Sequence, residues 1–401
     1  VVTGSSRGQI RVTTKVVLDF MLRRNRATSL GLSLDSSGNW ATSLMELVAK
    51  WCPVQVRFII LVAAMELLFD INPREETLDE PFIIVYMIDW LLKSPVNMIG
   101  LSVIDILLGL LQHMSFLLSP AGSEKQVELS GKRADLITLF QRCIGDLTTH
   151  IYYGDQVVDM IRVILTRIKP SSTHEHPAQV SGDSPGAASQ AGSLTGEASS
   201  IAFSSTTGRV AALRAIKNIL MVANSRKPAA VSGVESRNHV GIHVWEGTQW
   251  LLQERQGDAR YAYADALLSW LKLETNQSDL AVKDKHAKPS SPKRELTEVG
   301  ERTGKRSVST AMQREKAAIA AQFNFLRMLH LTIYDIALES PTSVSEIRLL
   351  HLILASLVDK LGVNAARFGL PMVLKLQDDL NSAPSLASGS AKVNIGSLVY
   401  G

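Results

Sequence analysis

Residues 52–70 read CPVQVRFIILVAAMELLFD, and this stretch decides the fold. Proline suits the first turn of a helix, because its fixed φ is helical and its missing N–H has no partner to lose there. After Pro53 the chain stays apolar for about five helical turns, interrupted only by Arg57 and Glu66. The pattern predicts one buried helix of a stacked array.

The opening of this stretch recurs upstream. Residues 9–11 (QIR) match residues 55–57 (QVR) at an offset of 46 residues. A period of about forty to fifty residues is typical of HEAT and armadillo repeats, which stack pairs of helices. We therefore predict an all-α, armadillo/HEAT-like helical-repeat solenoid, with two disordered insertions that are defined below.

Amphipathic spacing and proline positions predict the other helices. Pro81 and Pro95 are expected to begin helices at 82–93 and 96–118. The apolar run 96–118 is long enough to cross a bilayer, but Asp105 near its centre would cost ~3 kcal/mol there. We therefore expect a buried solenoid helix and no transmembrane segment. Further helices are expected at 9–24, 39–51, 133–152, 156–168, 209–216, 242–253, 261–273, 311–338, 347–361 and 367–380.

Composition is that of an ordinary globular protein. Of 401 residues, 46% are hydrophobic and 20% are charged, and the formal net charge is +4. This charge is far from the dense positive surface of a dedicated nucleic-acid binder, so we expect no nucleic-acid partner. The two cysteines, Cys52 and Cys143, are too few for a disulfide framework, which favours a reducing compartment.

Composition also divides the chain into five segments. Residues 169–207 are rich in Ser, Gly and Ala and carry few large apolar side chains, so they cannot offset the entropy of ordering and are expected to be disordered. Residues 274–309 form a charged, basic insertion. The expected domains are therefore N-terminal repeats at 1–168, central repeats at 208–273 and truncated C-terminal repeats at 310–401, separated by these two insertions.

The basic insertion contains the candidate site residues. Positions 283 to 306 contain eight lysines and arginines and four acidic residues, which leaves a surplus of four positive charges. A solvated loop is the ordinary interpretation, and contact with anionic lipid, worth ~1 kcal/mol per basic residue near the surface, is the alternative. Phosphorylation of Ser290 or Ser291 would offset the surplus. The candidate lipid-contacting residues are Lys283, Lys285, Lys288, Lys293, Arg294, Lys305 and Arg306.

Motifs that could carry catalysis or metal binding are incomplete. Residues 3–8 (TGSSRG) resemble the phosphate-binding turn of short-chain dehydrogenases, but Ile10 stands where the next glycine is needed. Two G-x-S-x-G patterns, at 4–8 and 182–186, lack the flanking strand and helix of a nucleophile elbow. His239 and His243 are four residues apart, but a glycine between them disfavours a helix. We expect no catalytic residue, metal or cofactor.

Three long stretches together resemble the fungal branch of the Eighty-five-requiring family, which is related to the animal protein rolling blackout. They are GRVAALRAIKNILMVANSRKPAAVSGVESRNHVGIHVWEGTQWLL at 208–252, YAYADALLSWLKLE at 261–274 and LLHLILASLVDKLGVNAARFGLPMVLKLQDDL at 349–380. The resemblance runs collinearly through the whole chain, including both insertions. Its specificity lies in this length, because no single short motif is diagnostic.

The resemblance implies a rod of helical repeats that acts as a peripheral scaffold on the cytoplasmic face of the plasma membrane and is not an enzyme. Such a scaffold recruits the type III alpha phosphatidylinositol 4-kinase, through a tetratricopeptide-repeat adaptor, for synthesis of phosphatidylinositol 4-phosphate. Its other implied partners are anionic inner-leaflet lipids. The family's N-terminal membrane-anchoring and C-terminal adaptor-binding regions are expected to lie outside these residues, so this piece alone is expected to be soluble.

Two other functions remain open from the sequence. A cytosolic HEAT-repeat module of another class, such as a transport receptor or a phosphatase scaffold, would have the same architecture. The turn at 3–8 leaves a dehydrogenase as the third hypothesis, which saturable NAD(H) binding would support.

Overall fold

The computed structural model describes residues 7–28, 40–71, 77–119, 131–169, 202–225, 237–282, 304–382, 386 and 388–401. Every regular element in these ranges is a helix, so the prediction of an all-α helical solenoid is confirmed. The chain separates into two compact units, Val1–Asn238 (unit 1) and His239–Gly401 (unit 2). The boundary between the units falls inside the range 208–273, which the sequence treats as one block of repeats.

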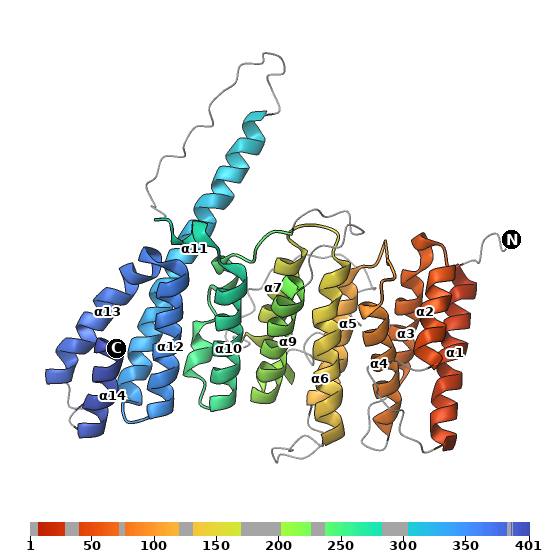
Figure 1. Ribbon diagram of the computed structural model, residues 1–401, viewed down its shortest axis with the longest axis horizontal. Helices are drawn as coiled ribbons and strands as arrows, with labels where there is room; N and C mark the ends of the chain where they lie inside the picture. Colours follow the sequence, from red (N-terminus) through yellow and green to blue (C-terminus); the bar gives the residue numbers. More distant parts are fainter. Residues whose placement is uncertain are drawn as a thin grey trace, which may run out of the picture. The chain divides into compact units, whose positions relative to one another are not determined.

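Unit 1 stacks its helices in two layers (Figure 1). In the first layer α1 packs on α3 and α3 on α5; in the second, α2 packs on α4, α4 on α6 and α6 on α9. The first layer comprises α1 (Arg7–Thr28), α3 (Phe58–Asp70), α5 (Val103–Leu118) and α7 (Gln156–Ile168). The second comprises α2 (Trp40–Trp51), α4 (Asp79–Lys93), α6 (Gly131–Asp146) and α9 (Thr206–Ser225).

Unit 2 repeats this two-layer plan. In one layer α10 packs on α12 and α12 on α14; in the other, two short 3₁₀ helices take the first place and are followed by two long helices. The first layer comprises α10 (Gly257–Glu274), α12 (Val344–Leu361) and α14 (Gly389–Tyr400). The second comprises η4 (Ile242–Trp245), η5 (Gln249–Gln253), α11 (Gly304–Glu339) and α13 (Val363–Ser382). A further 3₁₀ turn, η6 (Gln277–Leu280), packs on α12.

The stretch 52–70 supplies the buried helix that its apolar run predicts. Leu61 and Leu68 of α3 are completely buried. Helix α5 approaches so closely that a Cβ at Gly109 would lie 2.7 Å from the Met65 side chain. The helix does not begin at Pro53, which instead precedes a single 3₁₀ turn, η1 (Val54–Val56). The stretches 9–11 and 55–57 thus lie at the beginning of α1 and just before α3, which are neighbours in one layer.

Glycines with positive φ explain two helices that the sequence placed wrongly. The helix expected at 96–118 begins only at Val103, because Gly100 adopts φ +90°, which is incompatible with a continuous α-helix. The helix expected at 242–253 is divided into η4 and η5 at Gly247, whose φ is +75°. The helix expected at 133–152 ends at Asp146 and continues as a 3₁₀ turn, η3 (Leu147–His150).

Helical structure extends into the edges of both expected insertions. Phe203 is completely buried and α9 begins at Thr206, so 202–207 belongs to the folded repeats. Likewise, α11 begins at Gly304. The central parts, 170–201 and 283–303, lie outside the described residues, and their disorder stays a prediction.

Within the described ranges, we find no helix with the length and hydropathy needed to cross a membrane. The run 96–118, which raised that question, contributes a helix of 16 residues with Asp105 exposed in its first turn. It packs against α3 and α6. The expectation of a solenoid helix is therefore confirmed for this segment.

A buried carboxylate joins α4 to α6. Asp89 is 4% exposed and accepts hydrogen bonds from Lys93 Nζ at 2.7 Å and from Arg142 Nη2 at 2.5 Å. Lys93 Nζ also lies 3.7 Å from an oxygen of Asp146. In unit 2 a similar contact joins α10 to α12, where Arg260 Nη2 is 2.6 Å from Glu346 Oε1. Arg260, in the first turn of α10, thus joins this repeat to the next through a glutamate.

Histidine 113 is buried among aromatic rings in unit 1. Its ring centroid lies 4.4 Å from that of Phe69, on α3, and 6.1 Å from that of Phe140, on α6. Nε2 has no hydrogen-bond partner among the described residues. Burial lowers the pKa of His113 to about 4, because a charged imidazolium would lose its hydration there.

The Asp89→Asn substitution tests the tie between α4 and α6. It keeps the shape of the side chain but removes the charge that Lys93 and Arg142 share, so we expect a loss of about 2 kcal/mol in the free energy of unfolding. The loss stays below that of a fully buried pair because both cations are partly exposed. Urea unfolding measures it. Asp105→Asn, at an exposed position, is the control; equal effects of the two substitutions would contradict a special role for Asp89.

The His113→Phe substitution tests the buried imidazole. Since the folded pKa is depressed, the unfolded state binds a proton first as pH falls, and the stability present above pH 6.5 is lost progressively towards pH 4. The difference amounts to about 3 kcal/mol. We expect the free energy of unfolding of the parent protein to fall by this much more than that of His113→Phe between pH 7 and pH 4. Parallel pH profiles of the two proteins would refute this assignment.

Candidate functional site

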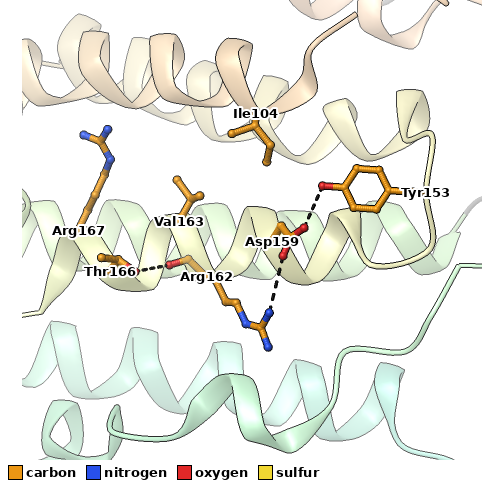
Figure 2. Close-up of a pocket in the computed structure, with 7 residues that line it drawn as sticks. All are labelled: Ile104, Tyr153, Asp159, Arg162, Val163, Thr166 and Arg167. Carbon is orange, nitrogen blue, oxygen red and sulfur yellow. Dashed lines mark hydrogen bonds and ion pairs between the residues drawn. The ribbon is translucent and has the colours of Figure 1, made fainter. Parts of the chain in front are cut away.

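A groove lies between α5 and α7 in unit 1 (Figure 2). It has a volume of about 490 Å³. Helix α7 buries one face in the core, and its other face carries Asp159, Arg162 and Thr166 at helical spacing. The groove is lined by Ile104, Tyr153, Asp159, Arg162, Val163, Thr166 and Arg167.

Tyr153 closes one end of the groove. Its hydroxyl donates a hydrogen bond of 2.9 Å to Asp159 Oδ2, while Arg162 Nη1 lies 3.7 Å from Asp159 Oδ1 (Figure 2). Burial raises the pKa of Tyr153, and the bond to the Asp159 carboxylate raises it further. The phenol therefore stays protonated and donates its hydrogen bond at neutral pH.

The turn that carries Tyr153 is fixed on both sides. The hydroxyl of its neighbour Tyr152 donates to the Met98 carbonyl, before α5. The backbone N–H of Asn238 donates to the Gly154 carbonyl at 3.0 Å, and its side chain donates to Asp155 at 2.7 Å. These contacts hold the end of the groove in place without using Tyr153 itself.

Arg167 lies at the opposite end, where its side chain extends away from Asp159 (Figure 2). Burial lowers the pKa of its guanidinium, although the group remains charged at neutral pH. Between the two ends, Ile104 from α5 and Val163 from α7 provide the apolar part of the lining. Thr166 uses its hydroxyl to bond the Arg162 carbonyl at 2.8 Å.

The arrangement is suited to binding and not to covalent chemistry. Catalysis by a nucleophile needs an activated hydroxyl, thiol or amine next to a base, and the Tyr153 hydroxyl is instead a donor with a raised pKa. No group of three or more His, Cys, Asp or Glu side chains that could hold a metal occurs in the part of the chain that the structure describes. Tyrosine and arginine are, however, the residue types that dominate protein-binding hot spots.

The candidate residues from the sequence are not among the residues that line the groove. Most of the basic insertion falls outside the described residues, namely Lys283, Lys285, Lys288, Lys293 and Arg294, together with Ser290 and Ser291. Lys305 and Arg306 lie in the first turn of α11, whose backbone is helical there. Lipid contact and phosphorylation at these positions therefore stay predictions.

Sequence reasoning missed the groove. The polar side of α7 was visible in the spacing of Asp159, Arg162 and Thr166, and that helix was predicted at 156–168. A polar helix face is ordinarily just a solvated face. This face of α7 lines a groove only because α7 is separated from α5, and local sequence patterns do not predict that separation.

Comparison with known proteins identifies relatives along the whole chain. The family model described as EFR3 protein matches residues 35–184. Protein efr3 of Emericella nidulans is 58% identical over all of this chain and 36% of its own length. Protein efr3 of Aspergillus oryzae is 59% identical with the same coverage. Protein EFR3 of Coccidioides immitis is 42% identical over all of this chain and 34% of its own length.

The relatives are longer than this chain. The chain spans about one third of the length of the curated relatives it matches. No solved structure matches it. The family description and the names of the relatives indicate no catalytic class. On the family model and on identity that extends over its whole length, the chain belongs to the fungal EFR3 family, the Eighty-five-requiring family that its sequence resembles.

Proposed function

We propose that this chain is part of a non-catalytic, peripheral scaffold that recruits phosphatidylinositol 4-kinase to the plasma membrane for synthesis of phosphatidylinositol 4-phosphate. Membership of the EFR3 family is the observation that carries the proposal. The kinase is contacted through a tetratricopeptide-repeat adaptor, and the scaffold lies on the cytoplasmic face of the membrane, as the family resemblance implies.

The physical properties of the described residues support a scaffold. Two-layer stacks of helices offer long surfaces to partners, and each repeat is held by its neighbours. The buried charges are engaged in joining helices: Asp89 ties α4 to α6, and Glu346 ties α10 to α12. The thiol of Cys143 is fully buried, and burial raises its pKa, which makes it an inert packing residue.

Membrane contact within this chain is assigned to the basic insertion. Its surplus of four positive charges equals the formal net charge of the whole chain. Basic clusters of this kind are attracted to anionic inner-leaflet lipids by about 1 kcal/mol per residue near the surface. Phosphorylation of Ser290 and Ser291 would cancel most of this surplus, because each phosphate adds nearly two negative charges at neutral pH.

Rapid depletion of the full-length protein in the source fungus tests the scaffold function. We expect a reporter of phosphatidylinositol 4-phosphate and the tagged kinase both to leave the plasma membrane, because recruitment depends on the scaffold. Live imaging before and after depletion measures this, with a resistant copy of the gene as the control. Retention of both signals would overturn the proposal, and recovery of transport cargo or a phosphatase with the protein would favour the other class of HEAT module.

Vesicle binding tests the basic insertion separately. The variant replaces Lys283, Lys285, Lys288, Lys293, Arg294, Lys305 and Arg306 with glutamine. We expect it to bind vesicles of phosphatidylcholine with about one fifth phosphatidylserine at least about tenfold more weakly than the parent in low salt. Co-sedimentation provides the measurement. In the control, the exposed Arg255, Arg348 and Arg367 become glutamine; an equal loss there would show a non-specific charge effect and remove the assignment.

A further inference from the structure

We propose that the groove between α5 and α7 binds a short, extended acidic peptide that also carries large apolar side chains. The site lies outside the basic insertion and does not depend on the kinase-recruiting function. Its recognition elements are the exposed Arg162 on α7, the aliphatic side chains of Ile104 and Val163, Arg167 at one end and Tyr153 at the other.

The groove marks a place where the layered packing of unit 1 opens. Helix α1 packs on α3 and α3 on α5, but the groove separates α5 from α7, the next helix of the same layer. Helix α7 is held instead by α9, in the other layer. Among the described residues, Ile104 and Val163 are therefore only half-buried, and no neighbouring helix covers them on this side.

The shape of the groove favours a peptide. It runs along α7 from the Tyr153 turn to Arg167, and the helical part of this distance is roughly 16 Å at 1.5 Å per residue. An extended chain rises about 3.3 Å per residue, so about five residues fit along it. Alternate side chains of an extended peptide point to opposite sides, which allows apolar groups to contact Ile104 and Val163 while acidic groups stay at the edge.

The charges favour an acidic peptide. Two guanidinium groups line the groove with one carboxylate, Asp159, which already accepts the Tyr153 hydrogen bond, and Asp155 adds a second negative charge at the Tyr153 end. Arg162 is 52% exposed, and its 3.7 Å approach to Asp159 is longer than a hydrogen bond, so the ion pair leaves the guanidinium accessible to a further carboxylate. Lys169, exposed just beyond α7, adds positive charge at the same end as Arg167. Planar guanidinium groups bind carboxylates with two parallel hydrogen bonds.

Fluorescence anisotropy with two designed peptides tests the proposal. The probe is a fluorescein-labelled peptide of about twelve residues that alternates leucine and glutamate, long enough to overfill the groove. The counterpart alternates leucine and lysine. We expect saturable binding of the acidic peptide by the whole chain, weakening as salt is added, and no saturable binding of the basic peptide.

Substitutions then localise the binding. Arg162→Glu should weaken it by about tenfold or more, since one attractive charge pair becomes repulsive. Arg214→Glu, an equally charged change at an exposed position of α9 outside the groove, should leave it unchanged. Urea unfolding of both variants shows that each is folded. As a second readout, the acidic peptide should slow maleimide labelling of a Thr166→Cys variant.

Three results would overturn the proposal. The first is that the acidic peptide shows no saturable binding, and the second is that both peptides bind equally well. The third is that the acidic peptide binds, but Arg162→Glu does not weaken its binding and the peptide does not slow labelling at position 166. Loss of phosphatidylserine-vesicle binding in Arg162→Glu without any effect on the peptide would also reject it, because the groove would then meet a membrane surface. None of these results bears on kinase recruitment, which the depletion experiment measures independently.

Discussion

Burial of one helix face against the neighbouring repeat is the constraint on which the structure depends. Helix α3 is apolar over most of its surface, and it can be buried only because α1, α4 and α5 surround it. The same requirement applies at Gly109, where a Cβ would lie 2.7 Å from the end of the Met65 side chain and that side chain would have to shift. It also explains the ring contacts of His113, a polar group held neutral where the helices meet. Ion pairs such as Asp89 with Arg142 fix how far one helix is shifted along its neighbour, which apolar contacts alone do not determine.

Helices with clear apolar spacing could be predicted from the sequence. Helix α7 was expected at 156–168 and occurs at Gln156–Ile168, because its buried positions follow the helical period. The bounds predicted for the helices at 96–118 and 242–253 were wrong for a common reason. Gly100 and Gly247 adopt positive φ. Glycine permits this conformation but does not require it, so the presence of a glycine in the sequence does not by itself indicate that a helix is interrupted there.

The candidate groove could not be predicted in the same way. Its residues come from α7, from the turn before it and from Ile104 on α5, and only tertiary packing brings these together. The basic insertion shows the opposite case, since charge counting identifies it without any knowledge of the fold. Family membership could be recognised without tertiary packing or charge counting, because it rests on long collinear similarity that covers every described helix.

The spacing of contacts along the chain has a consequence for biosynthesis. Contacts between neighbouring repeats join residues separated by 55 positions at Arg11 and Glu66, 53 at Asp89 and Arg142, and 54 at Met98 and Tyr152. In unit 2, Asn394 bonds the Pro341 carbonyl across 53 positions. A nascent chain needs only about one further repeat of synthesis before its latest helices find their partners. Unit 1 can therefore assemble from its N-terminal end on the ribosome, each docked repeat serving as the template for the next.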